Sequence, residues 1–136
     1  MIFYYWEFDM NDLEKVKKFV KNFVVEVWCD RNKSKVEHYY DENFTGFLNG
    51  SEIFNFSDVL KRIDYSKENF EKNDAEFHDI FIVSKDLIGA RLTMHRIDRN
   101  KEAKSVPVLL VIEVHADKIQ RLWLFTDLDY RYKDWN

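Results

Sequence analysis

The fold of this chain is decided by residues 87–115, LIGARLTMHRIDRNKEAKSVPVLLVIEVH. The segment reads as two β-strands joined by a polar turn, and a third strand follows at Ile119–Asp127. Because side chains alternate between the two faces of a strand, each strand divides into two sets. The apolar set of the first two strands is Ile88, Ala90, Leu92, Met94, Val106, Val108, Leu110, Ile112 and Val114. The opposite set carries Arg91, His95, Glu113 and His115. This division predicts an antiparallel sheet that buries one face.

The rest of the chain alternates helices with shorter strands. Asn11 is a suitable cap for an amphipathic helix that ends near Asp30, and Asn49-Gly50 is a dipeptide typical of tight hairpin turns. The remaining predicted elements are a short helix capped by Ser34 that runs through Tyr40, a hairpin over 43–56, a helix capped by Ser57 that runs to about Phe70, a charged loop over 71–74 and a strand at Phe77–Val83. The order predicts an α+β fold in which three helices cover one face of a curved antiparallel sheet.

Length and composition are those of a globular protein. The 136 residues suit a single domain, with a core over about 11–127, an aromatic arm at 1–9 and a tail at 128–136. The net charge is −4, and the basic residues are interspersed with acidic ones, so we expect neither a nucleic-acid nor a membrane partner. The one cysteine, Cys29, excludes an intramolecular disulfide and indicates a reducing cytoplasm. We interpret Cys29 as an ordinary thiol rather than a nucleophile.

Cofactor and metal motifs are missing from the sequence. No glycine-rich phosphate-binding motif occurs, so we expect no cofactor. His95, Glu113 and His115 are metal-binding residue types on one sheet face. The histidines fall toward opposite ends of the antiparallel pair, which favours a polar surface with cross-strand pairs such as Glu113 with Arg121 over a metal site.

Two local strings resemble the nuclear transport factor 2-like superfamily, which includes the SnoaL-like domains. They are Tyr39-Tyr40-Asp41-Glu42-Asn43-Phe44 and Ala116-Asp117-Lys118-Ile119, with Asp127 at the end of the last strand. With the order of elements, the resemblance covers nearly the whole chain. It implies a cone with a deep pocket between the helices and the concave sheet face. It also implies frequent dimers through the convex face.

The catalytic positions of that superfamily are apolar in this chain. By alignment with ketosteroid-isomerase-like members, the base falls at Phe47 and the two oxyanion donors fall at Phe23 and near Leu110. The last-strand acid of the cyclases and epoxide hydrolases falls at Leu124, and the Arg-x-Asp pair that the hydrolases add falls at Leu92 and Met94. The resemblance therefore predicts a protein that binds a small hydrophobic molecule without the usual catalysis. The predicted pocket residues are Phe23, Val27, Phe47, Leu92, Met94, Arg96, Leu110, Ile112, Leu122 and Leu124.

Two alternative functions stay open. A SnoaL-like isomerase, cyclase or dehydratase could use an atypical base, for which His78 and Tyr40 are the candidates. The protein could also be an adaptor for another protein.

Arg96 has two readings at the strand end: a side chain that extends into solvent, which we favour, or a clamp for a carboxylate at the pocket mouth.

The convex face carries a predicted apolar patch. Trp123 and Phe125 should share this face with Leu109 and Val111, and a patch of this kind is typical of an interface. We expect a homodimer, although the tail (Tyr130, Tyr132, Trp135) or the arm (Tyr4-Tyr5-Trp6) could cover the patch instead. The predicted interface residues are Arg91, Leu109, Val111, Glu113, Trp123 and Phe125.

Overall fold

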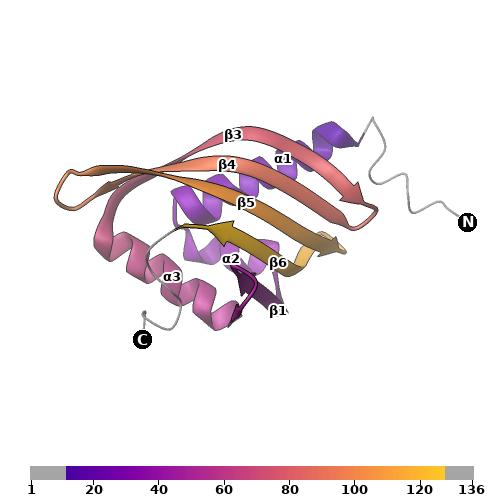
Figure 1. Ribbon diagram of the computed structural model, residues 1–136. Coiled ribbons are helices and arrows are strands. Elements are labelled where there is room, and N and C mark those ends of the chain that lie inside the picture. The colour runs from indigo at the N-terminus through magenta and orange to yellow at the C-terminus, as the bar shows by residue number, and fades with distance from the viewer. Residues whose placement is uncertain (1–11, 128–136) are drawn as a thin grey trace, which may run out of the picture.

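The helices of the computed structural model, which describes residues 12–127, lie mostly in the first half of the chain (Figure 1). Helix α1 (Leu13–Phe23) continues directly as a π-helix, η2 (Val24–Cys29). A 3-10 turn, η3 (Lys33–Lys35), leads into the short helix α2 (Val36–Tyr39), and α3 is Phe56–Asn69. The predicted cap Asn11, the arm at 1–9 and the tail at 128–136 lie outside the described residues.

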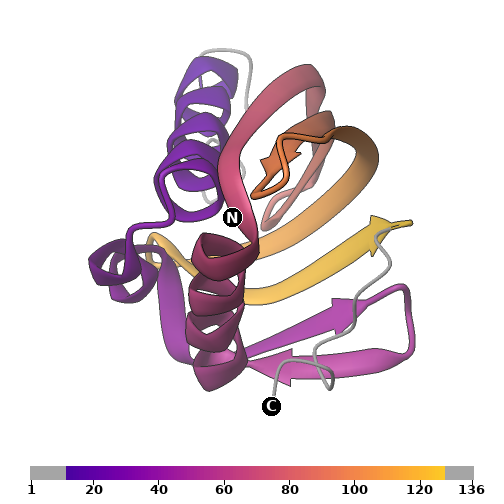
Figure 2. The same cartoon turned by 90° about the vertical axis from the view of Figure 1, so that its left-hand side faces the viewer.

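Six strands form one sheet in the order β2-β1-β6-β5-β4-β3. Their bounds are β1 Tyr40–Leu48, β2 Glu52–Asn55, β3 Phe70–Ser84, β4 Leu87–Asp98, β5 Ala103–His115 and β6 Lys118–Thr126. All neighbours are antiparallel except β1 and β6, which run parallel, so the sheet is mixed rather than purely antiparallel as predicted. The sheet curves, and the helices lie on its concave side (Figure 2). The predicted α+β cone is therefore confirmed.

The strand faces follow the predicted alternation. The even-numbered residues of β4 and β5 from Ile88 to Met94 and from Val106 to Ile112 are buried, whereas Arg91, His95 and His115 are exposed. Burial of aliphatic side chains is worth about 1.5–3 kcal/mol each, so a slip of register by one residue would expose this whole set. The helices cover the apolar face, which places the core between the two layers.

Four local predictions need correction. The segment over 71–74 is not a loop, because β3 begins at Phe70 and is an edge strand, where polar residues face solvent without cost. Helix α3 is capped by Asn55 rather than Ser57: Asn55 and Asp58 bond reciprocally in a capping box. Ser34 does not cap the second helix: it lies within the 3-10 turn η3, which is capped by Asn32, whose side chain accepts from the Ser34 amide. Strand β1 begins at Tyr40 instead of Asn43, because Tyr40 pairs with Ile119 of β6.

Within residues 12–127, the helices are all too short or too polar to cross a membrane.

Candidate functional site: a pocket on the concave face

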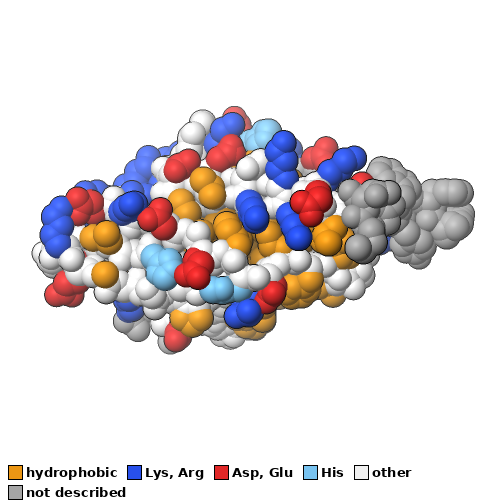
Figure 3. Space-filling model, turned by 90° about the horizontal axis from the view of Figure 1, so that it is seen from above, with side chains coloured by type: hydrophobic (Ala, Val, Ile, Leu, Met, Phe, Trp, Pro, Cys, Tyr) orange, Lys and Arg blue, Asp and Glu red, His pale blue; other side chains and the backbone are white. Residues whose placement is uncertain are grey.

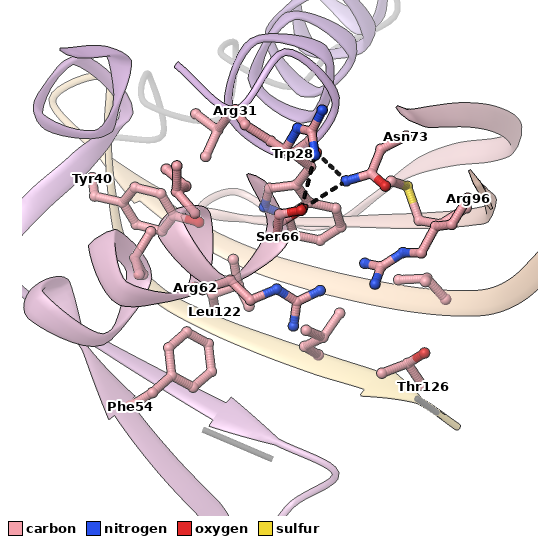
Figure 4. A pocket seen from close by; sticks show the side chains of 16 residues that line it. Trp28, Arg31, Tyr40, Phe54, Arg62, Ser66, Asn73, Arg96, Leu122 and Thr126 are labelled. Atoms are coloured by element: carbon pink, nitrogen blue, oxygen red, sulfur yellow. Dashed lines mark hydrogen bonds between the residues drawn. The ribbon is translucent and has the colours of Figure 1, made fainter. Parts of the chain in front are cut away.

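A cavity lies between η2, α3 and the concave face of the sheet (Figure 4). About 50 Å³ of it is open to the centre of a water molecule, which leaves room for a few waters or a small chemical group. Its apolar and aromatic wall consists of Val27, Trp28, Tyr40, Phe54, Val59, Ile63, Met94, Val108, Leu122 and Leu124. Its polar wall consists of Arg31, Arg62, Ser66, Asn73, Arg96 and Thr126.

Arg96 lies inside this cavity, so the favoured reading of a solvent-exposed side chain was wrong. The residue is only 4% exposed, and its guanidinium carbon lies 4.8 Å from the centre of the Phe70 ring. Burial, and to a smaller extent the positive charge of Arg62, lower the pKa of Arg96 to about 9. The alternation of β4 already indicated this position, because Arg96 continues the buried even-numbered series that ends at Met94.

Arg31 joins the two walls of the cavity. It follows η2 with a positive φ of 54°, and its guanidinium donates hydrogen bonds to the carbonyl oxygens of Ser66 (3.0 Å) and Phe70 (2.7 Å). These carbonyls lie at the C-terminal end of α3, where a cation is favoured by the helix dipole. Arg31 is thus a structural cap. Sequence reasoning missed it because its partners are 35 and 39 residues away.

Asn73 is a buried polar residue that no sequence pattern indicated. Its side-chain amide donates to the carbonyl oxygen of Trp28 and to the Ser66 hydroxyl, both at 3.1 Å. These two bonds fix the amide between η2 and α3. Its Oδ1 is buried, and within residues 12–127 it has no hydrogen-bond partner. The cavity wall thus holds an acceptor available to a donor.

Tyr40 is the one candidate base from the sequence that lines this cavity. Its ring is 3% exposed and meets those of Phe23 and Phe44 edge-on, with centroids 5.4 and 4.6 Å away. This aromatic cluster holds Tyr40 rigidly at the base of β1.

His78, the other candidate base, lies elsewhere. Its exposed ring is 2.7 Å from the Thr93 hydroxyl, at a bulge of β3 between Phe77 and Asp79. It borders a shallow surface groove with Lys17 and Lys21 of α1. The bulge turns His78 outward, away from the cavity.

The predicted pocket residues fall into three groups. Val27, Met94, Arg96, Leu122 and Leu124 line the cavity. Phe23, Leu92, Leu110 and Ile112 also face inward but are almost fully buried in the surrounding core. Phe47 was placed wrongly, because the alternation of β1 turns Phe44 and Leu48 inward and Phe47 outward, where it stacks on Trp123 with ring centroids 5.7 Å apart.

Cys29, at the end of η2, is not an activated nucleophile. Desolvation raises the pKa of its thiol to about 11, so the thiol stays protonated at neutral pH.

The histidines of the outer face bind separate partners. His95 lies 2.7 Å from both Ser105 and Glu76, and His115 lies 2.7 Å from Glu113. Glu113 also pairs with Arg121 at 3.7 Å, the predicted cross-strand contact. Residues 12–127 contain no group of three His, Cys, Asp or Glu side chains arranged to hold a metal ion. Glu76, His95 and Ser105 form a hydrogen-bonded series with the residue types of a hydrolytic triad. The three side chains are exposed, however, and the backbone N–H groups of these strands pair with neighbouring strands, so they do not form an oxyanion hole.

An apolar row crosses the outer face of all six strands. Residues paired from strand to strand are Ile53, Phe47, Trp123, Val111, Gly89 and Phe81, which we call the outer apolar row. Leu109 and Phe125, paired beside it, are 40% and 41% exposed. Figure 3 shows apolar side chains gathered on a face of the molecule with charged side chains around them.

Comparison with known proteins identifies the fold. No protein-family model and no curated protein matches the sequence. Among solved structures, a protein of Acidithiobacillus ferrooxidans proposed to be a polyketide cyclase is 14% identical, with a TM-score of 0.72 over 83% of this chain and 88% of the other. AclR of Streptomyces galilaeus, proposed to be a hydroxylase, is 12% identical, with a TM-score of 0.73 over 86% and 78%. A protein of Jannaschia sp. CCS1, proposed to be a SnoaL-like polyketide cyclase, is 10% identical, with a TM-score of 0.59 over 70% and 72%. These likenesses and the helix-covered cone show that the chain has the nuclear transport factor 2-like fold, in the form shared with SnoaL-like proteins.

Proposed function

We propose that this protein binds a small, mainly apolar molecule in the concave-face cavity and does not use the acid–base chemistry of its structural neighbours. The observation that carries the proposal is the composition of the wall: none of the residues from 12–127 that line the cavity is Asp, Glu or His. Proton abstraction needs a positioned base. Apolar walls with a few polar groups are the usual anatomy of a ligand site.

The same proposal includes a homodimer, formed through the outer apolar row in a reducing cytoplasm. Monomers seldom expose a contiguous apolar patch of this extent, and closed two-fold pairs are the commonest protein assemblies. The six predicted interface residues all lie on the row or directly beside it in the strand pairing.

Native mass spectrometry of the purified protein tests both parts in one experiment. We expect a dimer that carries a small molecule, released on denaturation. Leu124→Arg places a charge in the cavity and should abolish the bound mass while the dimer persists. Leu109→Arg places the same charge on the outer face and should give a monomer that still carries the ligand.

Two results would contradict the proposal. A bound mass that persists in a folded Leu124→Arg variant would place the ligand outside the cavity. If the Arg substitution unfolds the protein, Val108→Phe, which fills the cavity with an apolar ring, supplies the same test. A wild-type monomer would remove the dimer and favour an adaptor that offers the outer apolar row to another protein.

The second candidate function is a SnoaL-like isomerase, cyclase or dehydratase. One observation favours Tyr40 over His78 as its acid–base residue: Tyr40 lines the cavity and His78 does not. Turnover of a cyclic ketone or polyketide analogue that falls at least tenfold in Tyr40→Phe and stays intact in His78→Ala would establish it. Equal activity in both variants would remove Tyr40 from that role.

A further inference from the structure

We infer that the molecule held in the concave-face cavity carries a neutral hydrogen-bond donor, a hydroxyl or an N–H group, which donates to the side-chain oxygen of Asn73. The inference rests on the proposed function and specifies the chemical class of the ligand at the same site. It follows from the burial of Asn73, from the bonds that orient its amide group and from the composition of the wall around it.

Asn73 is a polar residue at an inward position of an edge strand. Of the fifteen residues of β3, all of them described, Asn73 alone is buried, with 5% of its surface exposed. Its neighbours Lys72 and Asp74 are exposed and pair with each other at 3.4 Å. A buried amide group costs free energy unless its polar atoms are hydrogen-bonded, so both its nitrogen and its oxygen need partners.

The side-chain nitrogen of Asn73 has its partners. It donates to the carbonyl oxygen of Trp28 and to the Ser66 hydroxyl, both at 3.1 Å (Figure 4). A carbonyl oxygen can only accept a hydrogen bond, so the nitrogen of Asn73, and not its oxygen, must face Trp28. This contact fixes the orientation of the amide group, which its shape alone would leave open to reversal.

The side-chain oxygen of Asn73 still needs a partner. Oδ1 is buried, and within residues 12–127 no hydrogen-bond donor reaches it. Asn73 is part of the cavity wall, so the cavity is where a partner for this oxygen enters. Buried acceptors are nearly always bonded in folded proteins, and the missing partner here is a donor.

The need for a donor excludes several classes of ligand. Ionised carboxylates, ketones, esters and ethers only accept hydrogen bonds, so they would leave Oδ1 unbonded. An ammonium group donates, but none of the residues from 12–127 that line the cavity is Asp or Glu, so no carboxylate of the wall would balance its charge. A neutral hydroxyl or N–H group avoids both penalties.

The rest of the wall selects the body of the ligand. Trp28, Phe54, Met94 and Leu122 offer ring faces, a thioether and aliphatic carbon. Aromatic rings pack well against such groups. The small open volume favours a compact body with a single ring over a long chain. The expected ligand class is therefore a small phenol or a small aromatic N–H compound.

The test is isothermal titration calorimetry of the full-length protein with p-cresol and p-xylene, which differ by the exchange of a hydroxyl for a methyl group of similar size. Water solvates the hydroxyl, so p-xylene would bind more tightly to a cavity without an acceptor. We expect p-cresol to bind about fivefold or more tightly than p-xylene, because the hydrocarbon leaves Oδ1 unbonded. Asn73→Leu, which keeps the size of the side chain but removes its acceptor, should abolish or reverse this preference.

Asn69→Leu is the matched control. Asn69 lies at the end of α3, where its exposed side-chain amide donates to the carbonyl oxygen of Tyr65 at 2.9 Å. The same exchange at this position should leave the preference for p-cresol unchanged. Circular dichroism confirms that each variant is folded.

NMR of the wild-type protein supplies a second readout if Asn73→Leu does not fold. A hydrogen bond to the amide oxygen should shift the side-chain nitrogen signal of Asn73 downfield when p-cresol binds, and p-xylene should not produce this shift. A nitrogen signal that p-cresol leaves in place would overturn the inference.

Different failures separate the inference from the proposed function. Equal affinity for the two compounds, or tighter binding of p-xylene, would overturn the inference and leave an apolar pocket in which water is the partner of Oδ1. A preference for p-cresol that persists in Asn73→Leu would place the hydroxyl elsewhere and also overturn it. If neither compound binds, the inference fails, and if in addition no small molecule co-purifies, the proposed function fails with it.

Discussion

Arg96 should lower the stability of the ligand-free protein, and its replacement by methionine should raise it. Burial lowers the pKa of this guanidinium from its ordinary value to about 9. Each step of one in pKa corresponds to about 1.4 kcal/mol, so holding this buried charge costs on the order of 5 kcal/mol. The contact with the Phe70 ring returns roughly 0.5–2 kcal/mol of that cost.

Methionine fills a similar volume without a charge, and it suits irregular apolar sites. We therefore expect Arg96→Met to raise the free energy of unfolding by about 1–4 kcal/mol at neutral pH, the range seen when buried ionic groups are replaced by apolar ones. Urea unfolding followed by circular dichroism measures it, with ligand removed by denaturation and refolding beforehand.

Lys72→Met, on the edge strand β3 and outside the proposed interface, provides the comparison. The Lys72 side chain is 62% exposed and pairs with Asp74 at 3.4 Å, and a surface ion pair contributes at most about 1 kcal/mol, so the stability of this variant should be unchanged or slightly lower. A loss of more than about 1 kcal/mol in Arg96→Met would refute the reasoning, because it would mean that the contacts of the guanidinium inside the protein outweigh the cost of burying its charge.

Three further predictions concern the framework of the cavity. Asn55→Ala should lower the free energy of unfolding by about 1 kcal/mol, because it removes the cap of α3. Gly46→Ala should lower the free energy of unfolding by about 1–3 kcal/mol, because the new Cβ would lie 2.2 Å from the buried ring of Phe54. Gly89→Ala should lower it less, because the half-exposed ring of Phe81 above this position can turn away. The Tyr39 hydroxyl donates to the Glu26 carboxylate at 2.7 Å, and this hydrogen bond lowers the pKa of Glu26 in the folded protein. The bond therefore stabilises the folded protein at pH values above the unfolded pKa near 4.5, and this stabilisation is lost as the pH falls through the lower folded pKa. The stability difference between wild type and Tyr39→Phe should accordingly shrink on acidification below pH 4.5.

Each of these has a simple counter-test by chemical unfolding. Ser57→Ala should be neutral, and a loss equal to that of Asn55→Ala would contradict the cap assignment. Equal costs at Gly46 and Gly89 would mean that ring burial does not decide the outcome. A stability difference for Tyr39→Phe that stays constant from pH 7 to pH 3 would show that the bond does not favour the ionised carboxylate.

Much of the sheet could be predicted because the signal that decides it, the alternation of apolar and polar residues, lies within single strands. The alternation in β4 and β5 separates a buried apolar set from a charged set, and only one register buries the former. The same alternation places Arg96 on the buried face of β4. It was misread because a charged side chain near a strand end usually extends to solvent.

The polar wall of the cavity could not be predicted because it depends on distant contacts. Arg31 and Asn73 bond to partners between 7 and 45 residues away, and nothing in their own neighbourhoods marks those partners. The segment over 71–74 looked like a loop because its polar composition suits either a loop or an edge strand. Only its pairing with β4 decides between them.

The parallel pairing of β1 with β6 has a consequence for synthesis on the ribosome. Tyr40 pairs with Ile119, and Leu48 with Leu124, so β1 has only the four-residue β2 beside it until β6 is made. Two-stranded hairpins are marginal in water, and pairings between distant segments form slowly. We expect the nascent chain to stay open at this seam until β6 has left the exit tunnel, which makes translation of the last strand the step that closes the cone.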